Sequence, residues 1–90
     1  MHSTSSSTTR LAVILFASQA PAREFAASPA RTRELIHQTV NQFGPDATAR
    51  ADAEVGWEYG RHPETAAAHM RACLQAVEAT LTPADGSVAR

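Results

Sequence analysis

The sequence contains no lysine and carries almost no net charge. All eight basic residues are arginines, nine residues are acidic, and the formal net charge at pH 7 is −1. The arginines are spread along the chain, so no basic face of the kind that binds nucleic acid is indicated. Arginine without lysine, beside abundant alanine, is what GC-rich codons favour. We therefore expect a high-GC source organism and do not expect nucleic acid as the partner.

Cysteine and large apolar side chains are also scarce. Cys73 is the only cysteine, so no internal disulfide can form, and a single thiol fits a cytoplasmic protein. The aromatic residues are three Phe, one Trp and one Tyr, and nearly half of the hydrophobic residues are alanine. About 60 residues are predicted to be ordered, and chains of that size usually need a disulfide, a metal or a partner to be stable.

No apolar run is long enough to cross a membrane. The longest, LAVILFA at residues 11–17, falls far short of the roughly 20 residues that a bilayer requires, and we expect no membrane partner. Three interpretations stay open. The run is the core of a secretion signal comprising residues 1–22, a buried strand that pairs with another molecule, or a short apolar helix that ends before Pro21. The polar, low-complexity residues 1–10 are predicted to be a disordered tail.

The rest of the sequence predicts an all-α fold. Ser28 is a good N-cap, Pro29 a good first helical residue, and Gly44-Pro45 a stop signal. Pro63 opens a further helix in the same way. We expect a small bundle of about three helices at 29–43, 47–59 and 63–82. Around it, residues 11–28 form an apolar segment and linker, 29–83 the helical domain, and 84–90 a second disordered tail.

Helical periodicity assigns a buried face to the first and third of these helices. Spacings of three and four residues mark one stripe on each. In the helix at 63–82 the stripe has the spacing of a heptad seam, which we interpret as packing against neighbouring helices rather than as a coiled coil. The stripes are Leu35, Ile36, Val40 and Phe43 in the first helix, with Thr32 and Thr39 between them, and Ala67, Met70, Leu74, Val77 and Leu81 in the third.

The middle helix has apolar residues on two opposite sides. Val55 and Tyr59 mark one side, and Trp57 points the other way. A bundle of three helices cannot easily bury both sides, and tryptophan is common at binding hot spots. Small residues beside Trp57 would let another helix approach closely, and the acidic pair Glu54 and Glu58 could meet an arginine on a partner. The predicted partner-binding residues are Trp57, Ala53, Gly56, Ala49 and Glu54.

Two arrangements of residues are candidates for metal or catalytic sites. Glu34 and His37 have the E-x-x-H spacing of di-iron bundles, but both point away from the apolar stripe of their helix. His69 and Cys73 share one helix flank, with His62 one to two turns earlier, yet a structural zinc site needs four ligands. Whether His69 and Cys73 bind metal stays open. We expect no cofactor and no enzymatic activity.

These features favour a non-catalytic protein-interaction or regulatory module. It would act through helix–helix association, as a homodimer or with another protein. One alternative is a helix-turn-helix-like DNA-binding regulator, built on the short turn before Pro63 with Arg61 and Arg71 on phosphate. Another is a small metal-binding or secreted protein.

Overall fold

The fold is built entirely from helices. The computed structural model of the chain describes residues 2–81, with side chains from residue 7 onward. No strand occurs among these residues, so the prediction of an all-α fold is confirmed. The elements are α1 (His2–Ala17), α2 (Ala22–Phe25), α3 (Pro29–Phe43), the 3-10 turn η1 (Gly44–Asp46), α4 (Ala47–Arg61) and α5 (Pro63–Leu81).

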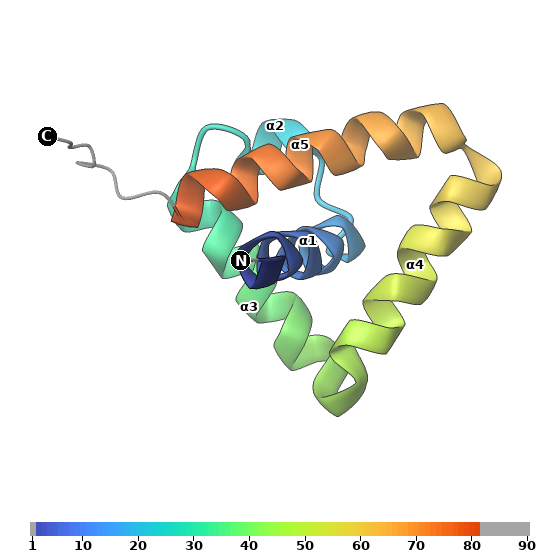
Figure 1. Cartoon of the computed structure of the whole chain (residues 1–90), viewed down its shortest axis with the longest axis horizontal. Coiled ribbons are helices and arrows are strands. Elements are labelled where there is room, and N and C mark those ends of the chain that lie inside the picture. Colours follow the sequence, from blue (N-terminus) through green and yellow to red (C-terminus); the bar gives the residue numbers. More distant parts are fainter. Residues whose placement is uncertain (1, 82–90) are drawn as a thin grey trace, which may run out of the picture.

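Helix α1 lies at the centre of the molecule. α3, α4 and α5 form the sides of a triangle around it, and α1 contacts all three (Figure 1). The apolar run of α1 is buried by these three helices: Ala12 and Leu15 are fully buried, and Phe16 is 5% exposed. A helix that is apolar all round must be covered on all sides, which the triangle achieves. Of the three interpretations of residues 11–17, the helix is confirmed.

The described part of the predicted tail at 1–10 is helical rather than disordered, and the predicted apolar segment and linker at 11–28 contains the rest of α1 and the short α2. Residues 2–10 form the first part of α1, in which Thr8 is buried. Serine and threonine are weak helix formers, so the helix here depends on packing of the apolar part that follows. Within the expected linker, α2 inserts a fully buried Phe25. Residue 1 and the predicted tail 84–90 lie outside the described residues.

The predicted ends of the remaining helices are close to those observed. Helix α3 has the expected bounds, because the Ser28 side chain accepts a hydrogen bond from the Arg31 amide at 3.1 Å and Gly44 follows with φ +78°. Helix α4 does not end at Tyr59 but continues through Gly60 to Arg61. Helix α5 begins at Pro63 as predicted and is described to Leu81; residue 82 lies outside the described part.

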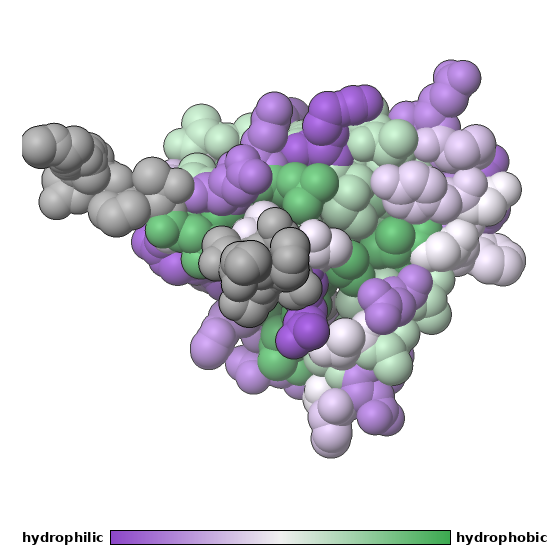
Figure 2. Space-filling view, in the orientation of Figure 1, coloured by the Kyte–Doolittle hydropathy of each residue, from purple (hydrophilic) through white to green (hydrophobic). Residues whose placement is uncertain are grey.

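The buried face of α5 differs from the predicted seam. Val77 is fully buried, but Leu81 is 50% exposed, and the other buried residues are Ala66, Cys73 and Ala76. The face is thus rotated by about 75° from the predicted one, at 100° per residue. Small side chains face the core here because α1 packs against α5. Figure 2 shows hydrophobic residues gathered inside the triangle and hydrophilic residues along its outer edges.

The predicted stripe of α3 is partly correct. Leu35 is buried and Ile36 packs against the core, whereas Val40 is 38% exposed. Thr32 and Thr39 are more buried than any apolar residue of the helix. Their hydroxyls donate to backbone carbonyls, from Thr32 to Ser28 at 3.1 Å and from Thr39 to Leu35 at 2.8 Å, which satisfies these polar groups inside the protein.

Candidate functional site

Trp57 lies on the outward side of α4. Its side chain is 62% exposed, the largest value among the exposed large hydrophobic residues of the described part. Ala49, Ala53 and Gly56 beside it are exposed as well. We call these four residues the Trp57 face. The opposite side of α4 carries Ala51, which is fully buried, and Val55, which packs on the core. Trp57 thus points away from the buried side of α4, as predicted, but Tyr59, predicted to lie on the buried side, is 37% exposed.

The Trp57 face is smooth and bordered by charge. A methyl group added to Gly56 would meet no atom within 4 Å, so the helix surface is open at that point. The Arg61 guanidinium carbon lies 5.6 Å from the centre of the Trp57 ring, a cation–π contact within the helix. Glu54, the fifth predicted partner-binding residue, lies on the edge of α4 between the Trp57 face and the buried side; it is partly buried, with its side chain near Phe16 and Gln19.

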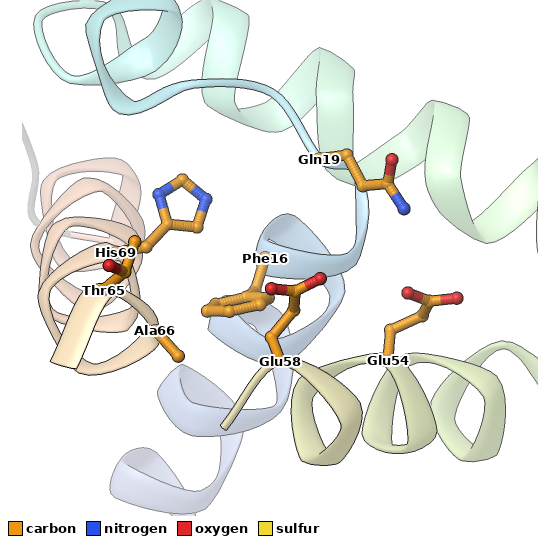
Figure 3. Close-up of a pocket in the computed structure, with 7 residues that line it drawn as sticks. All are labelled: Phe16, Gln19, Glu54, Glu58, Thr65, Ala66 and His69. Atoms are coloured by element: carbon orange, nitrogen blue, oxygen red, sulfur yellow. The ribbon is translucent and has the colours of Figure 1, made fainter. Parts of the chain in front are cut away.

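A hollow of about 250 Å³ opens where α1, α4 and α5 meet. We call it the α1/α4/α5 hollow. Figure 3 shows the side chains of Glu54 and Glu58 rising from the same side of α4, with the Phe16 ring of α1 beside Glu58. Helix α5 closes the other side. The lining residues are Phe16, Gln19, Glu54, Glu58, Thr65, Ala66 and His69.

Gln19 follows the C-terminal end of α1 and lies at the rim of this hollow. Gln19 has φ +66°, the left-handed conformation, which stops the helix before Ala20-Pro21. The backbone N–H of Gln19 donates a hydrogen bond to the carbonyl of Phe16 at 3.1 Å, which closes the last turn. Residues other than glycine adopt this backbone conformation at a cost of about 1–2 kcal/mol. The turn therefore fixes where the Gln19 side chain can reach.

His69 is held neutral by its apolar surroundings. Its ring meets the Phe16 ring edge-on at 4.9 Å between centres and the Phe25 ring at 6.1 Å. Burial lowers the pKa of His69 from its usual 6.5, and the nearby negative charge of Glu58 partly opposes that shift. The hollow therefore carries two carboxylates beside an uncharged imidazole near neutral pH.

The arginines of α4 leave the two carboxylates uncompensated. Arg50 and Arg61 are at helical spacings that would allow pairing with Glu54 and Glu58. Instead the Arg50 guanidinium lies 4.9 Å from the Phe43 ring centre, and Arg61 lies over Trp57. Arg31 does form salt bridges, to Glu24 and to Glu34, the latter at 2.9 Å, but these lie away from Glu54 and Glu58.

The residues weighed as metal or catalytic sites do not come together. Glu34 receives the Arg31 hydrogen bond on the surface of α3, and His37 is exposed. Cys73 is fully buried, and burial raises the pKa of its thiol to about 12, so it stays protonated and unreactive. Across the described residues no group of three or more His, Cys, Asp or Glu side chains is placed to hold a metal ion.

Only part of the α1/α4/α5 hollow could be predicted from the sequence. The Glu54–Glu58 spacing marked an acidic pair, but nothing in the pattern linked it to Phe16 or His69. These residues are brought together by the tertiary structure, because the contact requires α1 at the centre of the fold.

Within the part that is described, no helix has both the length and the apolar character needed to cross a membrane. Comparisons with protein-family models, with curated proteins and with solved structures find no match for this chain.

Proposed function

We propose that this chain is a non-catalytic interaction module that self-associates through the Trp57 face. The observation that carries the proposal is the 62% exposure of Trp57. Contiguous exposed apolar patches mark contact sites, and tryptophan is enriched at the binding hot spots of such sites. Ala49, Ala53 and Gly56 around it allow another helix to come close, which supports a helix as the occupant.

A second copy of the chain is the occupant that the charges support. A two-fold interface needs a surface complementary to itself. Glu54 and Arg61 lie on the same edge of α4, beside Trp57. In an antiparallel α4–α4 pair centred between Trp57 and Glu58, Glu54 of each copy would lie opposite Arg61 of the other. Both charge pairs would then border the two tryptophans.

The proposed dimer is weak. A helix of 15 residues is about 22 Å long and offers less than the roughly 800 Å² per partner of a standard interface. Tryptophan has an area near 250 Å², so burying its exposed part would remove about 150 Å² per copy from water. At about 25 cal/mol per Å² this stabilises the contact by about 4 kcal/mol per copy, before the costs of association. The two copies together give about 8 kcal/mol, and the association costs reduce this sum, so we expect a dissociation constant no tighter than roughly hundreds of micromolar.

A DNA-binding regulator and a secreted protein receive less support. For the DNA-binding regulator, Glu58 and Glu64 flank the corner between α4 and α5, and this negative charge argues against a helix-turn-helix that contacts phosphate there. The buried position of α1 supports a protein that keeps residues 1–22, since removing them would take Leu15 and Phe16 out of the core. We propose a cytoplasmic location on the single free thiol, Cys73.

Sedimentation of the purified protein across concentrations tests the proposed dimer. Trp57→Ala should keep its helical circular-dichroism signal and its melting temperature while becoming monomeric. Val40→Ala, which trims another exposed apolar side chain, should leave the association unchanged. A wild-type chain that stays monomeric at millimolar concentration would contradict the proposal, as would a Trp57→Ala dimer of unchanged affinity.

A charge exchange tests the pairing of the two copies. Glu54→Arg alone should weaken the dimer, because two arginines would then face each other. The double variant Glu54→Arg with Arg61→Glu should recover the association, since opposite charges are again paired. If the double variant associates no better than the single one, the antiparallel pairing of α4 is wrong even where the Trp57 face is the interface.

A further inference from the structure

The α1/α4/α5 hollow holds two acidic side chains that have no basic partner among the described residues. Glu54 and Glu58 are partly buried there, and within the described residues neither forms a salt bridge. Two carboxylates one helical turn apart repel each other, and partial burial strengthens that repulsion compared with water. A positive group in the hollow would relieve it.

The geometry disfavours a bare metal ion as that group. Calcium and magnesium require six or more oxygen ligands at short distance, and transition metals require several converging donors. No group of three His, Cys, Asp or Glu side chains among residues 7–81 meets that requirement. The one imidazole of the hollow is instead engaged edge-on with Phe16 and Phe25.

The apolar wall of the hollow favours a cation that carries carbon. Phe16, beside Glu58, and Ala66, on α5, supply apolar surface on the wall of the hollow toward α5 (Figure 3). A volume of about 250 Å³ lies below the usual range for drug-sized ligands, so the site suits a small molecule or a single side chain. At the rim, the Gln19 amide oxygen and the Thr65 hydroxyl can accept further N–H groups.

We propose that the α1/α4/α5 hollow binds a small organic cation of the alkylammonium or alkylguanidinium class. Glu54 and Glu58 accept hydrogen bonds from its charged head, and its carbon chain packs on Phe16. The same chemistry is offered by a free polyamine-like molecule and by an arginine or lysine side chain of a partner. Glu54 is shared with the charge pairs of the proposed dimer, whereas Glu58 and Phe16 lie away from the Trp57 face, so the site exists in the single chain and does not require the dimer.

The test is a titration of the full chain with small molecules. Calorimetry measures the binding, and the NMR signals of the His69 ring, which lines the hollow, report where it occurs. The probes are agmatine, its neutral analogue butylurea, magnesium chloride and the blocked peptide acetyl-Gly-Arg-Gly-amide. We expect agmatine or the peptide to bind and to shift His69, whereas butylurea and magnesium leave it unchanged. Tighter binding of the peptide assigns the site to a partner's side chain, and tighter binding of agmatine assigns it to a free cation.

Matched variants separate charge recognition from other effects. Glu58→Gln should weaken agmatine binding about tenfold, as expected for loss of a charge-assisted hydrogen bond, and Glu54→Gln should act in the same direction. Asp52→Asn removes the same charge from an exposed position of α4 and should leave binding unchanged. Trp57→Ala should also bind normally, so a failed dimer and a failed cation site give different results.

Several outcomes would overturn the proposal. Equal binding of butylurea would show that the hollow takes apolar molecules without regard to charge. Magnesium binding at lower concentration than agmatine would make it a metal site. Unchanged binding in the variant that combines Glu54→Gln and Glu58→Gln would place the cation elsewhere, and no shift of His69 with either agmatine or the peptide would leave the hollow without this ligand.

Discussion

Replacing Leu15 by alanine tests whether α1 is the core of the protein. Leu15 is fully buried at the centre of the triangle formed by α3, α4 and α5. Removing the outer atoms of a buried leucine costs about 2–5 kcal/mol, and more where the surroundings cannot collapse into the space. Three helices held apart by α1 have little freedom to do so, and we expect about 4 kcal/mol. About 80 ordered residues correspond to a total stability of roughly 4–12 kcal/mol, so the loss is a large part of it.

Urea denaturation followed by circular dichroism measures this loss. With a slope of about 1–2 kcal/mol per molar urea, the midpoint should fall by about 2 M or more, or the protein should be unfolded without urea. Leu81→Ala removes the same atoms from a side chain that is 50% exposed and should cost less than about 1 kcal/mol. Leu74→Ala, at a partly buried position, should lie between the two. Equal midpoints for the Leu15 and Leu81 variants would refute the central position of α1.

Three further predictions concern single side chains. Cys73 should react with a thiol reagent at pH 8 only as fast as the protein opens, because burial raises its pKa to about 12; rapid reaction of the folded protein would contradict its burial. Burial lowers the pKa of His69, so just below pH 6.5 the unfolded chain binds more protons than the folded one and stability falls as the pH is lowered through that range. Urea midpoints at pH 7.5 and 5.5 should show the fall, and His69→Gln should reduce it; an equal fall in the variant would assign it to another group. Ser28→Ala removes the cap of α3 and should cost about 1 kcal/mol by urea denaturation, while Ser28→Gly should cost less, and equal losses would argue against a capping role.

The three outer helices were predictable because local signals set most of their ends, the end of α4 two residues beyond Tyr59 excepted. Ser28, Pro29 and Gly44 bound α3 at the expected residues, and Pro63 opens α5. Helix α1 was not predictable in the same way. Its residues 11–17 are apolar on every side, so they show no period of 3.6 residues, and the polar residues before them have weak helix propensity. Only the presence of three surrounding helices decides their structure.

The phase of α5 shows a second limit of sequence patterns. Leu74 and Leu81 dominate its hydrophobic periodicity, yet the core takes the smaller Ala66, Cys73 and Ala76. Close approach of α1 selects small side chains, and hydrophobicity alone does not reveal that distance. In α4 the large residues did indicate the outward direction of Trp57. The α1/α4/α5 hollow could not be predicted, because it joins residues from three helices.

The central position of α1 also has a consequence for how the chain folds during synthesis. Helix α1 leaves the ribosome before α5, against which it packs. Until α5 emerges, the apolar run at 11–17 has no complete cover, and a partly made chain exposes Leu15 and Phe16. Contacts between distant segments also slow folding. We therefore expect the nascent chain to acquire its stable core in one late step and to depend, until then, on whatever protects exposed apolar segments in the cell.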